Sequence, residues 1–522
     1  MASTFFGLET AKRGLAAQQS ALYTTGHNIS NANTLGYSRQ RVNLTTTTPF
    51  EAPGMNRSGI TGQIGTGVQA GSVQRIRDSF ADLQYRTQNN KLGYYSSVGE
   101  SLIKMEEVMN EPSDSGLQAT MNQFWNALQT LTANPENSGA RSVVASTGQM
   151  VADTFNYYYN SLTAIQQDIG DQIDVTVKEI NTIIDNIHKL NQQISEVEPH
   201  GMLPNDLYDQ RDMLVDQLSG LVNIKVTKQK PDEYGLANAD AEGLYNIELV
   251  DEAGASYDPP VKLLEVTGAG IGAVNHFTVD IKNENGDYIP VDSVSVGGTE
   301  LPNMSFGGEL AGLIESYGYA GENGTEGYYP DMLNKLNTMA KAFADEFNSI
   351  HQSGVTNDGN PGVSFFEGAD AADGNYAKHI KVNADIIKDS SLVVTGKTGE
   401  AGDNSIAQEL ADLKSKSFTE YASFSAANPK PDMLSGNLDS FYSGIIGSLG
   451  VDSQSVQKNL ANTETIIDSV QQRRESTSSV SLDEEMVNMI TFQHAYNASS
   501  RMITVVDEML DKIINGMGRV GQ

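Results

Sequence analysis

The chain has 522 residues, with 66 acidic residues against 34 basic residues and no cysteine, so its formal net charge is −32. At about 150 residues per domain, this length predicts three or four domains. The acidic balance argues against nucleic acid or an anionic membrane surface as the main partner, because both favour a basic face. The absence of cysteine excludes disulfide scaffolds, thiolate zinc sites and thiol nucleophiles.

The charge is distributed unevenly. Residues 1–45 hold one acidic and four basic residues, whereas residues 480–522 hold six acidic and three basic residues. The two ends cancel, so the middle of the chain carries the whole −32. The N-terminal segment lacks a basic region followed by an apolar core, and no run approaches the about 18 apolar residues of a membrane span. We therefore expect no secretory signal peptide, no membrane insertion and, on these facts alone, a cytosolic protein.

The first thirty residues predict an amphipathic helix. A large aliphatic residue recurs every seven positions, and smaller or polar residues fill the alternate positions of the same face. The aliphatic residues are Leu8, Leu15, Leu22 and Ile29, and the alternate positions are Ala11, Gln18 and Thr25. This stripe is thin for a helix that must fold alone.

The C-terminus predicts a second helix, beginning with a capping box at Ser481 and Glu484. Its apolar stripe advances in steps of three and four residues. The stripe comprises Met489, Phe492, Tyr496, Ser499, Ile503, Val506, Leu510, Ile513 and Met517. Two helices with thin apolar stripes would cover each other's stripes, and the opposite net charges of the two terminal segments favour that contact. We therefore expect the terminal helices to pair like a coiled coil and the chain to begin and end in one place.

Long helices also fill the interior. From near Arg141, an apolar pattern of helical period continues until Pro199 and Gly201, which predicts a rod of about 57 residues and roughly 85 Å. Further helices are expected at residues 95–109, at 333–347 and, after a break at Gly447 and Gly450, at about 452–476. Their polar outer faces favour an elongated helical bundle.

Between residues 224 and 305 the pattern changes to short apolar alternations separated by turn signals, including Asn285-Gly286 and Gly297-Gly298. We expect an inserted all-β domain here, and irregular or mixed α/β structure at 355–435. The predicted fold is therefore mainly α, elongated and multidomain. Its expected domains are an inner helical domain of residues 1–45 and 480–522, a long helical bundle of residues 46–223 and 306–479, and a β-rich outer domain of residues 224–305.

No catalytic constellation is visible. The seven histidines lack metal-ligand spacing, and there is no HExxH, GxSxG or Walker lysine loop. The Gly268–Gly272 run fits a turn, and Asn357–Asn360 lacks the later glutamate of a calcium loop. The carboxylate pairs Glu106-Glu107 and Glu484-Glu485 are expected on solvated helix faces. We expect no enzyme activity, no cofactor and no metal.

The segment Gly26–Arg39 is unusually rich in asparagine, serine and threonine, whose side chains compete with helical hydrogen bonds. Gly36 permits a turn. A simple helix stop explains the glycine but leaves the density of asparagine unexplained. The segment therefore predicts a helix that ends in a tightly hydrogen-bonded corner.

This corner resembles the N-terminal signature of bacterial flagellar axial proteins (rod, hook and hook-associated), and the stretch 488–515 resembles their C-terminal motif. The matched residues are Asn28, Asn31, Ala32, Asn33, Gly36 and Tyr37, and Gln493, Ala495, Tyr496, Ala498, Asp507, Glu508, Met509 and Leu510. Three interior segments narrow the resemblance to the hook-associated protein 1 family. They are Ile64–Val68 with Arg75 and Asp78, Asn205–Asp212, and Gly307–Leu313, with a weaker match at Phe347–Gly354 and Phe365-Phe366.

The resemblance implies a structural role in assembly. Subunits would form a ring between hook and filament, contacting hook protein on one side and hook-associated protein 3 on the other. The terminal helices would line a hollow tube, with the β domain projecting outward. The resemblance also implies a cytoplasmic stage with a dedicated chaperone, followed by unfolded secretion through the flagellar type III exporter.

Assembly contacts are expected on the N-terminal helix and corner, at Leu8, Leu15, Leu22, Asn28, Ile29, Asn31, Asn33, Gly36 and Tyr37. Assembly or chaperone contacts are expected on the C-terminal helix, at Met489, Phe492, Tyr496, Ile503, Val506, Leu510 and Ile513. Two alternatives remain open: another axial protein of the hook type, and a flagellar shaft whose β insert acts as a secreted enzyme or adhesin. Segments 205–212 and 307–313 argue against the first, and 224–305 shows no catalytic set.

Overall fold

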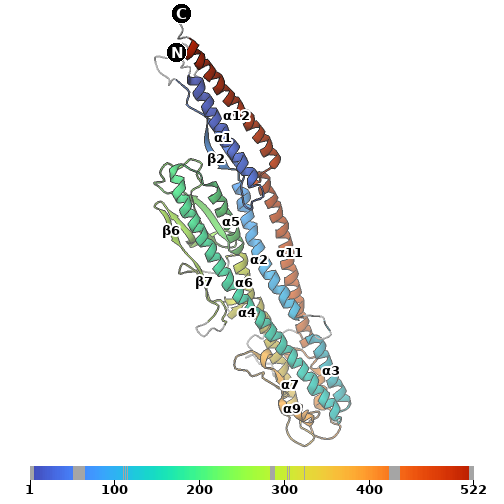
Figure 1. Ribbon diagram of the computed structural model, residues 1–522. Helices are drawn as coiled ribbons and strands as arrows, with labels where there is room; N and C mark the ends of the chain where they lie inside the picture. The colour runs from blue at the N-terminus through green and yellow to red at the C-terminus, as the bar shows by residue number, and fades with distance from the viewer. Residues whose placement is uncertain are drawn as a thin grey trace, which may run out of the picture. The chain divides into compact units, whose positions relative to one another are not determined.

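The computed structural model describes residues 5–50, 65–109, 111, 113, 116–282, 288–301, 304, 306–321, 324–421 and 436–516. The chain divides into two compact units (Figure 1). Unit 1 comprises residues 1–90, 180–276 and 464–522, and unit 2 comprises residues 91–179 and 277–463. Three long helices contribute residues to both units: α2 (Ser79–Met109), α4 (Ser138–Val197) and α11 (Leu438–Ser478).

In unit 1 the terminal helices α1 (Phe5–Ser30) and α12 (Leu482–Asp511) lie side by side, as predicted (Figure 1). A π-helical turn (Lys512–Gly516) follows α12. Small residues form the contact: a Cβ on Gly14 would lie 3.2 Å from the Ser499 hydroxyl oxygen, and one on Gly7 would lie 3.9 Å from Val506 Cγ2. Short side chains on α1 therefore let the two helices approach closely, while the predicted leucines flank the contact.

Two antiparallel β structures complete unit 1 with helix α5 (Asn205–Leu221) and a 3₁₀ turn (Glu198–His200). The hairpin of β1 (Gln40–Thr46) and β2 (Val68–Arg75) packs on α1. A four-stranded sheet has the order β3 (Ile224–Gln229), β4 (Leu244–Val250), β5 (Ser256–Thr267) and β6 (Gly270–Val274). Its core joins Ile194, Tyr208, Leu244 and Val266.

Unit 2 is mainly helical around an aromatic core. Its remaining helices are α3 (Leu117–Ala133), α6 (Gly308–Tyr317), α7 (Tyr328–Gln352), α8 (Tyr376–His379), α9 (Ala384–Lys388) and α10 (Ser405–Asp412), with 3₁₀ turns at Ser390–Leu392 and Phe418–Glu420. Its strands are β7 (Phe277–Val279), β8 (Val294–Val296) and β9 (Thr299–Glu300) in one sheet, and the pairs β10 (Tyr319–Gly321) with β11 (Gly324–Glu326) and β12 (Phe366–Glu367) with β13 (Lys381–Val382).

The aromatic core of unit 2 also buries a histidine. The Phe347 ring lies 4.8 Å from Phe365 and 5.3 Å from Phe366 between centroids. His351 lies beside them. Its Nδ1 lies 2.7 Å from the Val363 carbonyl oxygen, and its Nε2 accepts a hydrogen bond from the Val394 amide at 3.0 Å. Burial lowers the pKa of His351 to about 4, so this ring is a neutral core residue at pH 7.

The mainly helical fold class is confirmed, and so is the long rod: α4 has 60 residues and gives way to a 3₁₀ turn before Gly201, at φ +80°. The predicted break at Gly447 and Gly450 is wrong, because α11 runs through both. Burial of neighbours such as Tyr442 and Leu449 outweighs the about 1 kcal/mol that each helical glycine costs. None of the described helices combines the length and hydropathy needed to cross a bilayer.

The segment 224–305 contains strands, as predicted, and these belong to two sheets. Strands β3–β6 lie in unit 1 and β7–β9 lie in unit 2. The hairpin β1–β2 is absent from the sequence prediction, because its exposed, polar residues give no clear alternation. Asn285-Gly286, Ile64 and Met517 lie outside the described residues, and the domain boundaries stay a prediction.

A substitution at Gly312 in α6 tests whether the close approach of α6 to α2 in unit 2 requires a glycine. A Cβ at this position would lie 2.2 Å from the Ser97 hydroxyl and 2.9 Å from the Tyr94 carbonyl oxygen. We expect Gly312→Ala to lower the free energy of unfolding by about 1–3 kcal/mol through overpacking. The matched control is Gly447→Ala in α11, where a Cβ meets nothing within 4 Å, and it should raise stability by up to about 1 kcal/mol. Urea unfolding followed by circular dichroism measures both, and equal effects would contradict the packing argument.

Candidate functional site

The corner after α1 is organised by the side chain of Asn28, which is 1 % exposed. Its Oδ1 accepts hydrogen bonds from the Gln40 amide at 3.0 Å and the Tyr37 hydroxyl at 2.8 Å. Its Nδ2 donates to the Gln40 carbonyl at 2.8 Å and to Glu485 Oε2 at 3.1 Å. This one amide uses both donors and two acceptor sites, and so ties α1 to β1 and α12.

The other corner residues fix the turn itself. Tyr37 donates its single hydroxyl hydrogen to Asn28, so His27 Nδ1, 2.9 Å from that hydroxyl, carries a proton and donates to it. Burial, with the nearby carboxylates, raises the pKa of Tyr37, which keeps its hydroxyl a donor. Asn31 Nδ2 donates to the His27 carbonyl at 3.1 Å. Gly36 adopts φ +79°, a conformation that favours glycine.

Arg39 connects this corner to the start of α12. Its Nε lies 2.7 Å from Glu485 Oε1 and its Nη1 lies 2.7 Å from Glu484 Oε2. Its backbone amide donates to the Ser478 carbonyl at 2.9 Å. Ser481 caps α12 as predicted, accepting from the Glu484 amide at 3.4 Å. The expectation of a solvated face is wrong for Glu485, whose side chain is 3 % exposed because Arg39 and Asn28 neutralise and bond it.

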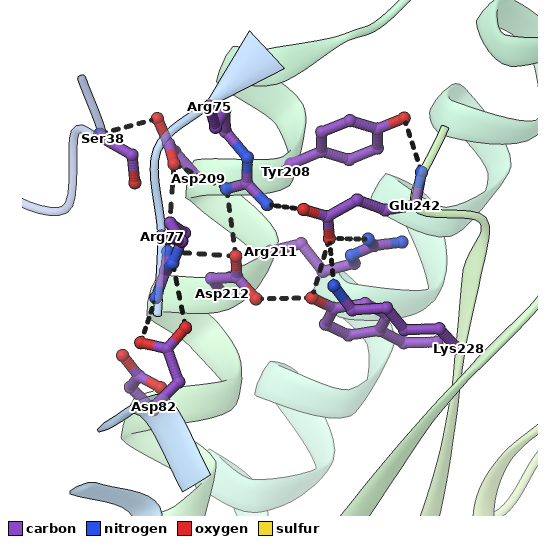
Figure 2. A network of polar contacts seen from close by, with 12 residues as sticks. Ser38, Arg75, Arg77, Asp82, Tyr208, Asp209, Arg211, Asp212, Lys228 and Glu242 are labelled. Carbon is purple, nitrogen blue, oxygen red and sulfur yellow. Dashed lines mark hydrogen bonds and ion pairs between the residues drawn. The ribbon is translucent and has the colours of Figure 1, made fainter. Parts of the chain in front are cut away.

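The first turns of α5 bind the corner and strand β2 through carboxylates. Asp209 accepts from the Ser38 amide at 2.9 Å and pairs with Arg75 Nη1 at 2.6 Å (Figure 2). Asp212 lies one turn further along α5 and pairs with both Arg75 Nη1 and Arg77 Nη1 at 3.0 Å. Because both acids lie on the same face of α5, this helix receives Arg75 from the end of β2 and Arg77 from the segment after it.

A second layer of the network reaches the sheet. Glu242, just before β4, lies 2.5 Å from Arg75 Nη2 (Figure 2). The Tyr245 hydroxyl donates to Asp212 Oδ1 at 2.7 Å. The fully buried Arg211 stacks on the Tyr245 ring at 3.4 Å from its centroid and donates to the Gly243 carbonyl at 2.8 Å. We call Arg75, Arg77, Asp82, Arg86, Asp209, Arg211, Asp212, Asp216, Glu242 and Arg474 the charge network.

Asp212 is the electrostatic centre of the charge network. Burial by itself raises the pKa of this carboxyl, but the guanidinium groups of Arg77, Arg75 and Arg86 together hold that pKa well below its usual range. Burial also works against the charge of Arg75, yet the surrounding carboxylates raise its pKa. Asp212, Arg75, Arg77 and Arg86 are therefore ionised at neutral pH, whereas burial raises the pKa of Asp209. Removal of one charged partner leaves a buried charge without a counter-ion.

The charge network extends to the end of α11. Arg474 pairs with Asp82 at 2.7 Å and with Asp216, and Arg86 also pairs with Asp216 at 2.8 Å. The paired groups come from five stretches of chain: 28–39, 75–86, 205–216, Glu242 before β4, and 474–485. Within the described residues, no group of three or more histidine or acidic side chains is arranged to hold a metal ion. The arrangement joins distant segments, and its carboxylates are committed to arginines.

The structure places the predicted contact residues in two groups. Asn28 is buried, Asn31 and Tyr37 are half-buried, and Asn33 and Gly36 are exposed, while Leu8, Leu15, Leu22 and Ile29 are half-buried along α1. On α12, the half-buried residues lie on the face toward α1, namely Met489, Phe492, Tyr496, Ile503, Val506 and Leu510, whereas Ile513 is exposed. The structure thus brings the two predicted stripes to one helix pair, and their role in assembly stays a prediction.

A second apolar stripe on α12 lies roughly 120° around the helix from the face toward α1, at 3.6 residues per turn. We call it the free stripe: Val487, Ala498, Met502, Val505 and Met509 on α12, continued by Ile513 of the π-helical turn, all of them exposed. Ile513, predicted for the first stripe, thus borders this one. Met502 and Met509 are 54 % and 57 % exposed. The stripe is not among the predicted patterns. Its steps are three or four residues only from Ala498 onward, since eleven residues separate Val487 from Ala498, and the stronger stripe masks it.

Comparisons with known proteins agree with this anatomy. Residues 102–366 match the family described as flagellar hook-associated protein FlgK helical domain. Residues 8–37 match the family described as flagella basal body rod protein, and residues 471–516 match the C-terminal family of the flagellar basal body rod FlgEFG protein. The paired terminal helices and these matches define the class of flagellar axial proteins.

Individual relatives narrow the assignment. Flagellar hook-associated protein 1 of Bacillus subtilis (strain 168) is 46 % identical over 530 aligned residues, covering 100 % of both chains. The protein of that name from Salmonella typhimurium is 25 % identical, over 97 % of this chain and 98 % of its own. The solved flagellar hook junction protein FlgK from Burkholderia pseudomallei, 13 % identical, covers 76 % of this chain and 100 % of its own with a TM-score of 0.56, which shows a shared fold.

The chain belongs to the flagellar hook-associated protein 1 family, the hook–filament junction proteins. It is a structural component of the bacterial flagellum.

Asp212→Asn tests the electrostatic centre. Asparagine keeps the shape but removes the charge, so we expect the free energy of unfolding at pH 7 to fall by about 3–5 kcal/mol. Because the folded-state pKa of Asp212 is lowered, its contribution in the wild type is present above about pH 4 and is lost as the pH falls, and the variant should lack this part of the acid dependence. Urea unfolding at several pH values, with hydrogen exchange of α5 peptides, measures both effects.

The control for that experiment is Asp468→Asn, an exposed position on α11 in unit 1. It should change stability by no more than about 0.5 kcal/mol. Equal stability of D212N and D468N would refute a central role for Asp212.

Arg39→Ala tests the connection between the corner and α12. The change leaves the buried Glu485 carboxylate without its guanidinium partner, so the first turns of α12 should open more often. We expect amide hydrogen exchange in residues 482–492 to accelerate by about tenfold or more, measured by mass spectrometry. Arg41→Ala, an exposed position two residues further along in β1, is the matched control and should leave exchange unchanged. Unaltered exchange in R39A would show that Asn28 alone holds the helix.

Proposed function

We propose that the chain assembles through its terminal helix pair into a ring that joins the flagellar hook to the filament and allows the filament to grow. The observation that supports this most directly is the free stripe of α12. The helix carries two apolar stripes, and α1 covers one of them. The other presents large apolar side chains in a line, and apolar patches of this kind mark interaction sites.

The pair offers two different surfaces to its neighbours. One is the free stripe, and the other is the half-exposed leucine row of α1. A contact between unlike surfaces of two copies is heterologous, and heterologous contacts generate rings or helical arrays. Charge supports the same arrangement, because α1 exposes Lys12 whereas the end of α12 exposes Asp507, Glu508 and Asp511.

The corner and the charge network fix the base of the terminal helix pair rigidly. They hold the base of the pair to α5 and the β1–β2 hairpin through buried ion pairs. A helix pair fixed at its base presents its outer surfaces in one orientation, which reduces the entropy lost on association. The proposed role is thus mechanical, and the paired charges of the network perform no catalysis in it.

Family membership supports the partners and the route. We assign hook protein and hook-associated protein 3 as the neighbours along the flagellum, and secretion through the type III exporter after a cytoplasmic stage. A chaperone bound to the α12 stripe that includes Phe492 and Val506 by helix-in-groove recognition would compete with α1, because these residues face α1 in the folded chain. Chaperone binding and formation of the terminal pair therefore exclude each other.

Replacement of Val505 and Met509 by aspartate tests the proposal. Both side chains are exposed, so the monomer should keep its unfolding midpoint while the apolar contact is lost. We expect at least a tenfold loss of self-association in sedimentation, and no fluorescent band between hook and filament when the labelled variant replaces the native protein in cells. A chain lacking residues 480–522 should fail in the same way.

The matched control is Val143→Asp with Met150→Asp, a valine and a methionine exposed on α4 in unit 2. It adds the same charges and should assemble normally. Normal assembly of V505D/M509D, or of the truncated chain, would overturn the proposed role of the terminal pair.

A further inference from the structure

The free stripe holds two of the exposed methionines of the described residues, and Met150, Met202 and Met486 are exposed elsewhere. The chain has 17 methionines and no cysteine, so thioethers are its only sulfur groups. Methionines of the unit cores are closed to solvent, as at Met105, Met121 and Met339, each no more than 1 % exposed. Met502 and Met509, in contrast, stand seven residues apart in the centre of the free stripe with more than half of their surface open.

We propose that Met502 and Met509 form a reversible oxidation site through which a hydroperoxide prevents incorporation of the free subunit. This inference rests on the proposed function of the free stripe. The thioether sulfur attacks the outer oxygen of the peroxide, a sulfur–oxygen bond forms and the oxygen–oxygen bond breaks. The departing oxygen takes the proton of the attacked hydroxyl and leaves as water from hydrogen peroxide, or as an alcohol from an organic hydroperoxide. Sulfur is oxidised by two electrons and the peroxide is reduced, and a methionine sulfoxide reductase with a dithiol restores the thioether.

The consequence follows from the position of the two side chains. Each sulfoxide replaces an apolar side chain with a strong hydrogen-bond acceptor. Assembly must remove water from this surface, and burying the acceptor without a partner costs free energy. Neither residue lies on the face toward α1, so oxidation leaves the helix pair and the folded monomer intact. An assembled subunit buries both sulfurs against its neighbour, and oxidation therefore acts only before incorporation.

The test treats the purified full chain with hydrogen peroxide and maps sulfoxides by peptide mass spectrometry. Met502 and Met509 should oxidise at least tenfold faster than Met105, Met121 and Met339. Treated wild type should lose self-association by at least tenfold with an unchanged unfolding midpoint, and reductase treatment should restore it. Met502→Leu with Met509→Leu, which keeps helical propensity and volume, should assemble equally well before and after peroxide.

The control variant is Met150→Leu with Met202→Leu, which removes two exposed methionines outside α12 and should stay sensitive to peroxide. Full assembly of wild type oxidised at both positions, or loss of assembly by treated M502L/M509L, would overturn this inference alone. Failure of the untreated wild type to assemble would instead overturn the proposed function, and this inference with it.

Discussion

The ion pairs of Asp212 are the contacts on which unit 1 depends. One carboxylate on α5 receives Arg75 from the end of β2, Arg77 from the segment after it and Arg86 from α2. It also accepts the Tyr245 hydroxyl from the sheet. Buried charges of this kind add little net stability compared with a well-packed apolar core, but each is costly to leave unpaired. Their effect is therefore to exclude other arrangements. A hairpin, a helix and a sheet that could pack in several ways are held in one.

The corner extends that constraint to the terminal helices. Asn28 and Arg39 converge on Glu485, so the base of α12 is joined to the end of α1 by charge and by an amide with both donors in use. Beyond this base the pair depends on small residues and a thin apolar contact. The chain thus combines a rigid base with a helix pair that is only partly buried. This arrangement suits a subunit that completes its packing in an assembly.

Local pattern was informative wherever a helix had one strongly apolar face. The rod α4, the pairing of α1 with α12 and the capping serine of α12 were predictable, because side chains three and four residues apart must share a face. The resemblance also brought forward Arg75 and the Asn205–Asp212 segment. Prediction failed where neighbours outweighed local preference. Gly447 and Gly450 remain helical because the surrounding aromatic and aliphatic residues are buried, and the β1–β2 hairpin is stabilised by its contact with α1.

The sequence by itself determined the helical character of the chain, the asymmetric charge of its ends, the absence of thiol chemistry and, through its motifs, its family. Only the tertiary structure decided which acids meet which arginines, because Asp212 and Arg75 are distant in sequence and each has many alternative partners. The tertiary structure likewise decided which stripe of α12 packs against α1 and which stays exposed to solvent. Helical periodicity shows that a face is apolar, but the choice of partner depends on the small residues of α1, and their spacing does not say which helix will contact them.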